Sequence, residues 1–197
     1  MKVKICGTTH LEDALFCEAL QVDFLGFIFH PDSPRYLEYS TAKSIISSLN
    51  YAKPIGVFVD HTPDEIARVA QDLKLWGVQI YHDYDLTGFP FEVIRAHRFR
   101  GPADTLILRD LLASPLYDYV LVDAYHERHV GGTGQGFDWS LLPADLSRIF
   151  LAGGIGLHNI DAVKSLQPFA IDLVSGVERI PGRKDFTKLQ ALMEKLK

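Results

Sequence analysis

Short apolar runs alternate along this chain with segments of helical periodicity, and this alternation limits the possible folds. Eight runs rich in β-branched and aromatic residues cover residues 3–6, 24–29, 54–59, 77–81, 93–97, 119–122, 149–152 and 171–174. Most are continuously apolar, as is typical of parallel strands buried on both faces. Strands and helices that alternate in this number predict an α/β fold, a compact (β/α)8 TIM barrel.

The length of 197 residues lies at the lower limit for such a barrel, so we expect one domain over residues 1–197 with shortened elements. Residues 83–90, which contain Gly88 and Pro90, and residues 137–142, before Pro143, leave little room for a helix. An open, doubly wound sheet is the alternative, because the alternation alone does not decide whether the sheet closes.

Three helices have clear sequence signals. Thr9 with Glu12 predicts a capping box, and Thr62 with Glu65 predicts another, with Pro63 in the first turn. A last helix over residues 185–197 would pack on the barrel through one apolar side, made of Leu189, Leu192, Met193 and Leu196.

Composition excludes several classes of partner. The net charge of -5 comes from scattered acids and bases, so there is no basic face for nucleic acid. The apolar runs are far shorter than the roughly 18 residues that span a bilayer, and no signal-peptide pattern is visible. The two cysteines, Cys6 and Cys17, do not form a disulfide framework. We expect a monomeric cytoplasmic protein that binds a small molecule, with no nucleic acid and no membrane as partners.

Two candidate catalytic residues lie at predicted carboxyl ends of strands, where the active site of a barrel forms. Cys6 ends the first strand near a helix N-terminus that would stabilise its thiolate, and Asp123 ends the sixth strand, where partial burial would raise the pKa of an acid. Both also have plainer interpretations: Cys6 as a structural core cysteine, and Asp123 as a helix cap or ion-pair partner. Cys17, inside a helical pattern, is interpreted as core.

Several residues could bind an anion. Arg35, in the loop after the second strand, has a planar guanidinium that fits a carboxylate or a phosphate, although a solvated arginine is equally compatible. Glycine-rich turns after strands seven and eight expose backbone N–H groups, a common phosphate site in barrels, although a tight turn would explain any one of them. These turns contain Gly153 and Gly154, then Ser175 and Gly176.

The sequence favours neither a metal nor a cofactor. His126-Glu127-Arg128-His129 lacks the spacing of the helical zinc motif and has no identifiable third ligand. No dinucleotide or nucleoside-triphosphate loop motif occurs. We therefore expect no metal and no cofactor.

Three stretches are specific enough to identify a family. They are Lys4-Ile5-Cys6-Gly7, Gly131-Gly132-Thr133-Gly134 with Phe137-Asp138-Trp139, and Ser175-Gly176-Val177-Glu178. With the other motifs, taken in order, they make the chain resemble the phosphoribosylanthranilate isomerases of tryptophan biosynthesis nearly from end to end.

This resemblance implies a cofactor-free Amadori rearrangement of N-(5-phosphoribosyl)anthranilate to 1-(2-carboxyphenylamino)-1-deoxyribulose 5-phosphate. It implies that Cys6 is the general base, that Asp123 is the general acid and that Arg35 and Gly7 bind the substrate. The implied phosphate-binding residues are Gly153, Gly154, Ser175 and Gly176. Two alternatives are another phosphosugar isomerase or epimerase, and a barrel that binds a phosphorylated ligand without turnover.

The chain departs from the family pattern after Gln79. The family usually continues with Leu-His-Gly, whereas this chain has Ile80-Tyr81-His82. A displacement by one residue along a strand reverses the direction of a side chain. We therefore expect His82 to point away from the direction of the family histidine.

Overall fold

Eight parallel strands form a closed barrel in the computed structural model of the chain, which describes residues 1–124 and 138–196. Neighbours along the sequence pair in the order β1 to β8, and β1 closes the ring by pairing with β8. The strands are β1 Lys2–Ile5, β2 Phe24–Ile28, β3 Lys53–Phe58, β4 Gly77–Ile80, β5 Glu92–Phe99, β6 Tyr119–Ala124, β7 Ile149–Ala152 and β8 Ala170–Leu173.

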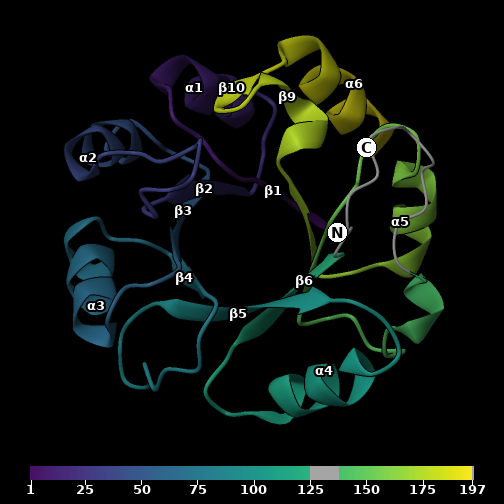
Figure 1. Cartoon of the computed structure of the whole chain (residues 1–197). Coiled ribbons are helices and arrows are strands. Elements are labelled where there is room, and N and C mark those ends of the chain that lie inside the picture. Colours follow the sequence, from purple (N-terminus) through teal and green to yellow (C-terminus); the bar gives the residue numbers. More distant parts are fainter. Residues whose placement is uncertain (125–137, 197) are drawn as a thin grey trace.

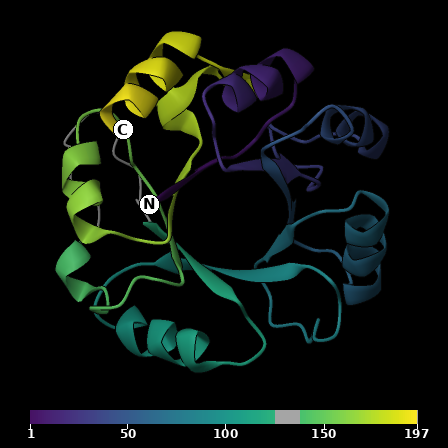
Figure 2. The same cartoon turned by 180° about the vertical axis from the view of Figure 1, so that it is seen from behind.

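Helices surround the ring of strands, as the view in Figure 1 and the view from behind in Figure 2 both show. They are α1 Leu11–Ala19, α2 Tyr39–Ile46, α3 Pro63–Asp72, α4 Asp104–Ala113, α5 Ile160–Leu166 and α6 Phe186–Leu196. Short 3-10 turns cover Trp139–Leu141 and Ser175–Val177. Among the described residues, no helix has the length and apolar character needed to cross a membrane.

The predicted strands coincide with β1 to β8, with ends that differ by one or two residues. The closed ring confirms the barrel and rules out the open sheet. Residues 83–90 contain no helix, as expected, and the described part of the loop between β6 and β7 contains only the turn Trp139–Leu141. Shortened connections explain how the barrel is completed within 197 residues.

An aromatic cluster fills the end of the barrel where the strands begin. Phe24 and Trp76 have ring centroids 4.6 Å apart, and those of Tyr119 and Phe169 are 4.4 Å apart. Phe150 contacts Phe24, Tyr119 and Phe169 at centroid distances of 5.3 to 5.5 Å. The cluster packs aromatic rings across this end of the barrel.

The helix starts show one correct and one wrong prediction. Thr62 and Glu65 form the expected capping box of α3. The predicted box at α1 does not form: His10 occupies the N-cap position without a side-chain hydrogen bond. The Thr9 hydroxyl instead donates to the carbonyl oxygen of Gly182, far along the chain, so a tertiary contact replaces the local cap.

A small antiparallel hairpin between β8 and α6 was not predicted. It consists of β9 Glu178–Ile180 and β10 Arg183–Lys184, and Gly182 at its turn has a φ of +81°. The Lys184 backbone N–H donates to Asp13 Oδ2 at 3.1 Å, which attaches the hairpin to α1. Figure 1 shows β9 and β10 beside α1, close to the end of β1.

Helix α6, which follows the hairpin, packs on the barrel as the sequence predicts. Leu189, Leu192 and Met193 are buried, and Leu196 packs against the same core.

Candidate active site

A cavity of about 790 Å³ opens at the carboxyl ends of the strands. All but one of the predicted site residues line it, although they come from loops and strands that are far apart in the sequence. They are Cys6, Arg35, Asp123, Gly153, Gly154, Ser175 and Gly176.

Cys6 follows directly after β1 and is buried, with 4% of its surface exposed. Burial raises the pKa of the Cys6 thiol, while the positive charges of Lys4 and Lys184 oppose the increase. The expected stabilisation of the thiolate by a helix N-terminus is therefore wrong as the main influence, because desolvation dominates and α1 begins only at Leu11.

The second cysteine and the predicted acid also have clear positions. Cys17 is a fully buried core residue of α1, as expected, and burial raises its pKa to about 12. Asp123 lies in β6 two residues after Leu121, and both side chains line the cavity. Residues two apart in a strand share a face, so Asp123 points into the mouth of the barrel.

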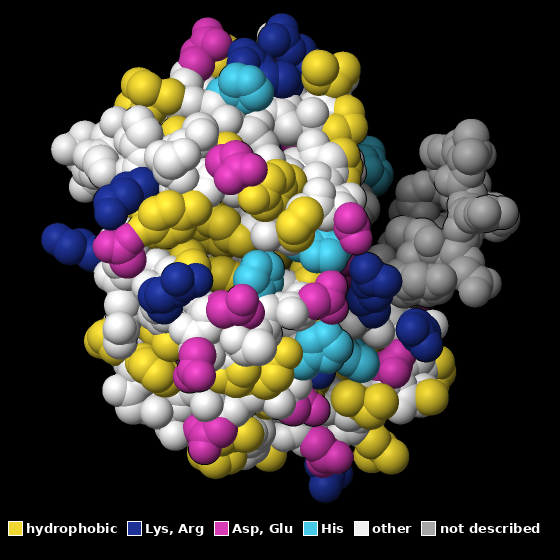
Figure 3. Space-filling model, turned by 60° about the vertical axis from the view of Figure 1, so that its left-hand side comes forward, with side chains coloured by type: hydrophobic (Ala, Val, Ile, Leu, Met, Phe, Trp, Pro, Cys, Tyr) yellow, Lys and Arg dark blue, Asp and Glu magenta, His cyan; other side chains and the backbone are white. Residues whose placement is uncertain are grey.

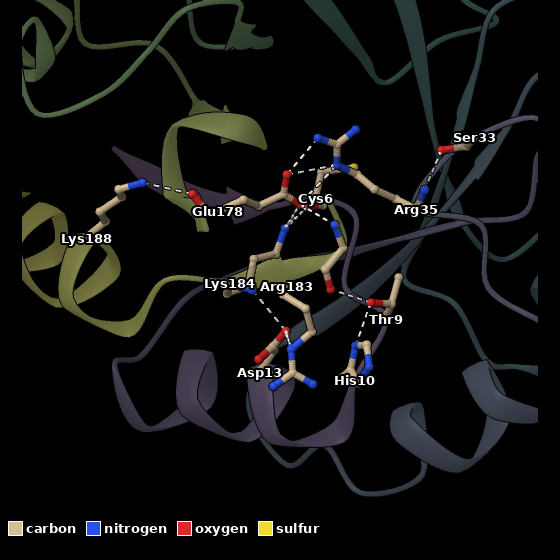
Figure 4. A network of polar contacts seen from close by, with 11 residues as sticks. Cys6, Thr9, His10, Asp13, Ser33, Arg35, Glu178, Arg183, Lys184 and Lys188 are labelled. Atoms are coloured by element: carbon tan, nitrogen blue, oxygen red, sulfur yellow. Dashed lines mark hydrogen bonds and ion pairs between the residues drawn. The ribbon is translucent and has the colours of Figure 1, made fainter. Parts of the chain in front are cut away.

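Arg35 forms a two-pronged ion pair with Glu178, as Figure 4 shows. Its Nε lies 3.0 Å from both carboxylate oxygens, and its Nη2 lies 2.6 Å from Oε2. The pKa of Arg35 is raised, above all by its hydrogen bonds to Glu178. Within the described residues, no hydrogen bond of Arg35 Nη1 is seen. Glu178 therefore holds the guanidinium in place, while the edge that carries Nη1 is available to a ligand.

Lys184 contacts Glu178 from the other side. Its Nζ lies 3.0 Å from Glu178 Oε1 and also donates to the backbone oxygen of Cys6. Burial alone would raise the pKa of Glu178, but the bonds from Arg35 and the charge of Lys184 outweigh it and keep that pKa below its ordinary value. Glu178 thus connects the hairpin to Arg35, and Lys184 connects it to the end of β1.

Gly7 is the one predicted site residue that does not line the cavity. Its φ is +70°, and a Cβ atom at this position would lie 2.5 Å from Arg35 Cδ. Glycine here makes room for the arginine side chain, so the structure connects Gly7 to the site through Arg35.

The loops after β7 and β8 bring glycine backbone close together. Gly153 and Gly154 have φ angles of +87° and +64°, which favour glycine. A Cβ on Gly176 would lie 2.6 Å from the carbonyl oxygen of Ile155. The two loops therefore approach each other closely through backbone atoms, and glycine at position 176 leaves room for that approach.

Polar residues inside the barrel were not assigned to the site from the sequence. Gln79, Tyr81 and Asp172 line the cavity, and the fully buried Lys4 bonds to two of them. The available signal was a polar residue at an inward position of an otherwise apolar strand, as in Ile171-Asp172-Leu173. Glu178 belonged to a recognised motif but had no assigned role.

His82 points away from the cavity, which agrees with the prediction from its displaced position. Tyr81 lines the cavity, whereas His82 is exposed and lies 3.8 Å from Asp60. His30 lies 3.6 Å from the same carboxylate. Figure 3 shows histidine and acidic side chains next to one another on the face that it draws.

The two sequence motifs 126–129 and 131–134 lie outside the described residues. Within residues 1–124 and 138–196, no group of three or more His, Cys, Asp or Glu side chains could hold a metal ion.

Comparisons with a family model and with curated relatives identify one family. The family model described as N-(5'-phosphoribosyl)anthranilate (PRA) isomerase matches residues 3–195. An N-(5'-phosphoribosyl)anthranilate isomerase of Geobacter sp. is 38% identical over 203 residues, which cover 100% of this chain and 98% of the relative.

Solved structures agree. The phosphoribosyl anthranilate isomerase of Thermus thermophilus is 35% identical, with a TM-score of 0.84 over 100% of this chain and 98% of that one. A second phosphoribosyl anthranilate isomerase structure, in complex with reduced 1-(o-carboxyphenylamino)-1-deoxyribulose 5-phosphate, is 32% identical. Its TM-score is 0.82, and the match covers 98% of this chain and 97% of that one. The chain belongs to the N-(5'-phosphoribosyl)anthranilate isomerase family.

Proposed function

We propose that the protein isomerises N-(5'-phosphoribosyl)anthranilate to 1-(o-carboxyphenylamino)-1-deoxyribulose 5-phosphate in this cavity, with Cys6 as general base and Asp123 as general acid. The single observation that carries the proposal is the convergence of a thiol, a carboxyl group, an arginine and two glycine-rich loops on one cavity. A phosphorylated glycosylamine that carries a carboxylate needs all of these groups at once.

The reaction begins with opening of the ribosyl ring. Asp123 donates a proton to the ring oxygen as the bond between C1 and that oxygen breaks, which leaves an iminium between C1 and the anthranilate nitrogen. The iminium draws electrons from C2 and makes its hydrogen acidic. The Cys6 thiolate removes this proton and an enolamine forms. The enolamine takes up a proton at C1 and loses one from the C2 hydroxyl, which gives the ketone.

The two ends of the substrate are anions that need fixed partners. Arg35, held by Glu178, directs its Nη1 edge to the anthranilate carboxylate. The phosphate accepts hydrogen bonds from the backbone of the loops that contain Gly154 and Gly176, with Ser175 beside them. Binding at both ends places C1 and C2 between the acid and the base.

The test follows the loss of anthranilate-type fluorescence when freshly generated phosphoribosylanthranilate is mixed with the purified protein. Wild type should consume the substrate far faster than its spontaneous decay. Cys6→Ala and Asp123→Asn should abolish turnover while still binding inorganic phosphate, which separates catalysis from folding. Turnover by Asp123→Asn within a few-fold of wild type would remove Asp123 from the mechanism.

We further propose that the enzyme works as a monomer in the cytoplasm. Cys6 and Cys17 are both free thiols, as a reducing compartment would maintain them. Light scattering coupled to gel filtration tests the oligomeric state, and a mass near 44 kDa, about twice the 22.1 kDa of one chain, would contradict it.

A further inference from the structure

A line of polar side chains runs from the wall of the cavity into the barrel interior. Asp172 Oδ1 lies 3.0 Å from Lys4 Nζ, and the same Nζ donates to Gln79 Oε1 at 2.9 Å. Gln79 Nε2 donates to the Tyr81 hydroxyl oxygen at 3.0 Å. Lys4, Gln79 and Asp172 are buried in a layer where such barrels usually carry apolar residues. The mechanism above uses none of these four residues.

The chemistry of Lys4 sets the direction of the hydrogen bonds. An ammonium group can only donate, so the Gln79 atom that faces it must be the amide oxygen. The amide nitrogen of Gln79 then faces Tyr81 and must donate. The Tyr81 oxygen is therefore an acceptor in the bond to Gln79, and its own proton is free to be donated elsewhere.

The Tyr81 hydroxyl is held at the cavity wall. Tyr81 follows β4 and lines the cavity together with Cys6 and Asp123, and its ring packs against the apolar residues inside the barrel. Within the described residues, the bond from Gln79 is the only hydrogen bond seen for this hydroxyl. Burial, followed by the nearby charge of Cys6, raises the pKa of Tyr81 to about 12, so the phenol keeps its proton at neutral pH.

We propose that Tyr81 is a substrate-binding residue whose hydroxyl donates a hydrogen bond to the oxygen on C2, and that Gln79 and Lys4 are positioning residues that orient it. This inference rests on the proposed function. Cys6 deprotonates C2, and Tyr81 lines the cavity beside Cys6. The oxygen on C2 ends the reaction as a ketone, which can only accept, so a partner that holds it throughout must be a donor. Phosphate and carboxylate have other partners at Gly176 and Arg35.

Tyr81→Phe removes one hydroxyl and leaves the ring in place. We expect kcat/KM to fall about tenfold, because a buried hydrogen bond to the substrate is lost, and the affinity for inorganic phosphate to stay unchanged. Tyr51→Phe, at an exposed tyrosine, is the matched control and should behave as wild type. A kcat/KM for Tyr81→Phe within twofold of wild type would overturn the proposal.

A binding experiment identifies the substrate atom without relying on turnover. It compares the reduced product, whose C2 carries a hydroxyl, with an analogue that has no oxygen at C2. Tyr81→Phe should weaken binding of the first ligand about tenfold and leave the second unchanged. Equal losses for both ligands would refute the contact at C2. If the wild-type protein failed to turn over phosphoribosylanthranilate but Tyr81→Phe still weakened binding of the first ligand alone, the proposed function would be contradicted and the role of Tyr81 would not.

Gln79→Leu tests the orienting role. It should lower kcat/KM in the same direction as Tyr81→Phe, and the double variant should be no worse than Tyr81→Phe alone, because Gln79 acts through the hydroxyl. Losses that multiply in the double variant would show that Gln79 acts independently and contradict the positioning role. Should Gln79→Leu fail to fold, as a thermal melt would reveal, the two Tyr81→Phe experiments still decide the proposal.

Discussion

Glu178→Gln should destabilise the fold strongly, because it removes one carboxylate from between two cations. The side chains of Glu178 and Lys184 are 4% and 0% exposed, and that of Arg35 is 18% exposed. Glutamine keeps the shape but not the charge, so Lys184 becomes a buried ammonium group without a counter-charge. Breaking a buried ion pair from one side costs about 3 to 5 kcal/mol.

This loss is large enough to measure by thermal unfolding. A protein of this size loses about 2 to 4 °C of Tm for each kcal/mol. We expect Tm at pH 7 to fall by about 10 °C in circular dichroism or calorimetry. Lys43→Met is the control, since Lys43 and Asp72 form an exposed pair at 3.3 Å that contributes about 1 kcal/mol or less.

The double variant Glu178→Gln, Lys184→Met tests the cause. Removing the buried ammonium group together with the carboxylate should recover part of the lost Tm, because the uncompensated charge has gone. A Glu178→Gln variant whose Tm lies within about 2 °C of wild type, like the exposed control, would refute this reasoning.

The pH dependence of stability should follow from the lowered pKa of Glu178. Its stabilisation is present above the ordinary value of 4.5 and is lost as the pH falls through the lower folded-state value. The difference in Tm between wild type and Glu178→Gln should therefore shrink in acid.

The remaining predictions concern the site. Cys6→Ser should lower kcat by at least about 100-fold with unchanged phosphate affinity, as expected for a lost general base and checked by the fluorescence assay. Burial raises the pKa of the Cys6 thiol, so kcat/KM should rise with pH above neutrality as the thiolate forms. The charge of Lys4 opposes this increase in pKa, so Lys4→Met should raise the thiol pKa further, as measured by thiolate absorbance. An unchanged thiol pKa in Lys4→Met would contradict the role of the Lys4 charge. Gly176→Ala would bring a methyl group against the carbonyl oxygen of Ile155 and should weaken inhibition by inorganic phosphate, while an unchanged inhibition constant would argue against this loop as the phosphate site.

Local patterns were sufficient to predict where chemistry could occur. Inward and outward positions alternate along a strand, and loops that follow parallel strands meet at the same end of a barrel. The positions of Cys6, Asp123 and Arg35 at one cavity could therefore be predicted without coordinates. The displaced His82 followed the same rule, because its direction depends only on its position along the chain.

The wrong predictions concern residues whose behaviour depends on distant neighbours. Thr9 has the sequence of a helix cap, but its hydroxyl bonds to Gly182. Cys6 precedes a helix, but its pKa depends mainly on burial. Neither a hydrogen bond across the fold nor the removal of water from a thiol has a local sequence pattern.

The eight strands, the family and the residues that meet at the mouth of the barrel could be inferred from the amino-acid sequence alone, because these depend on periodicity and on short motifs. Two contacts could be seen only in the folded chain: Glu178, 143 positions from Arg35, holds the Arg35 guanidinium, and Lys4 reaches Gln79, 75 positions away. The physical reason is that ion pairing and desolvation depend on distances in space, which barrel closure sets and separation along the chain does not.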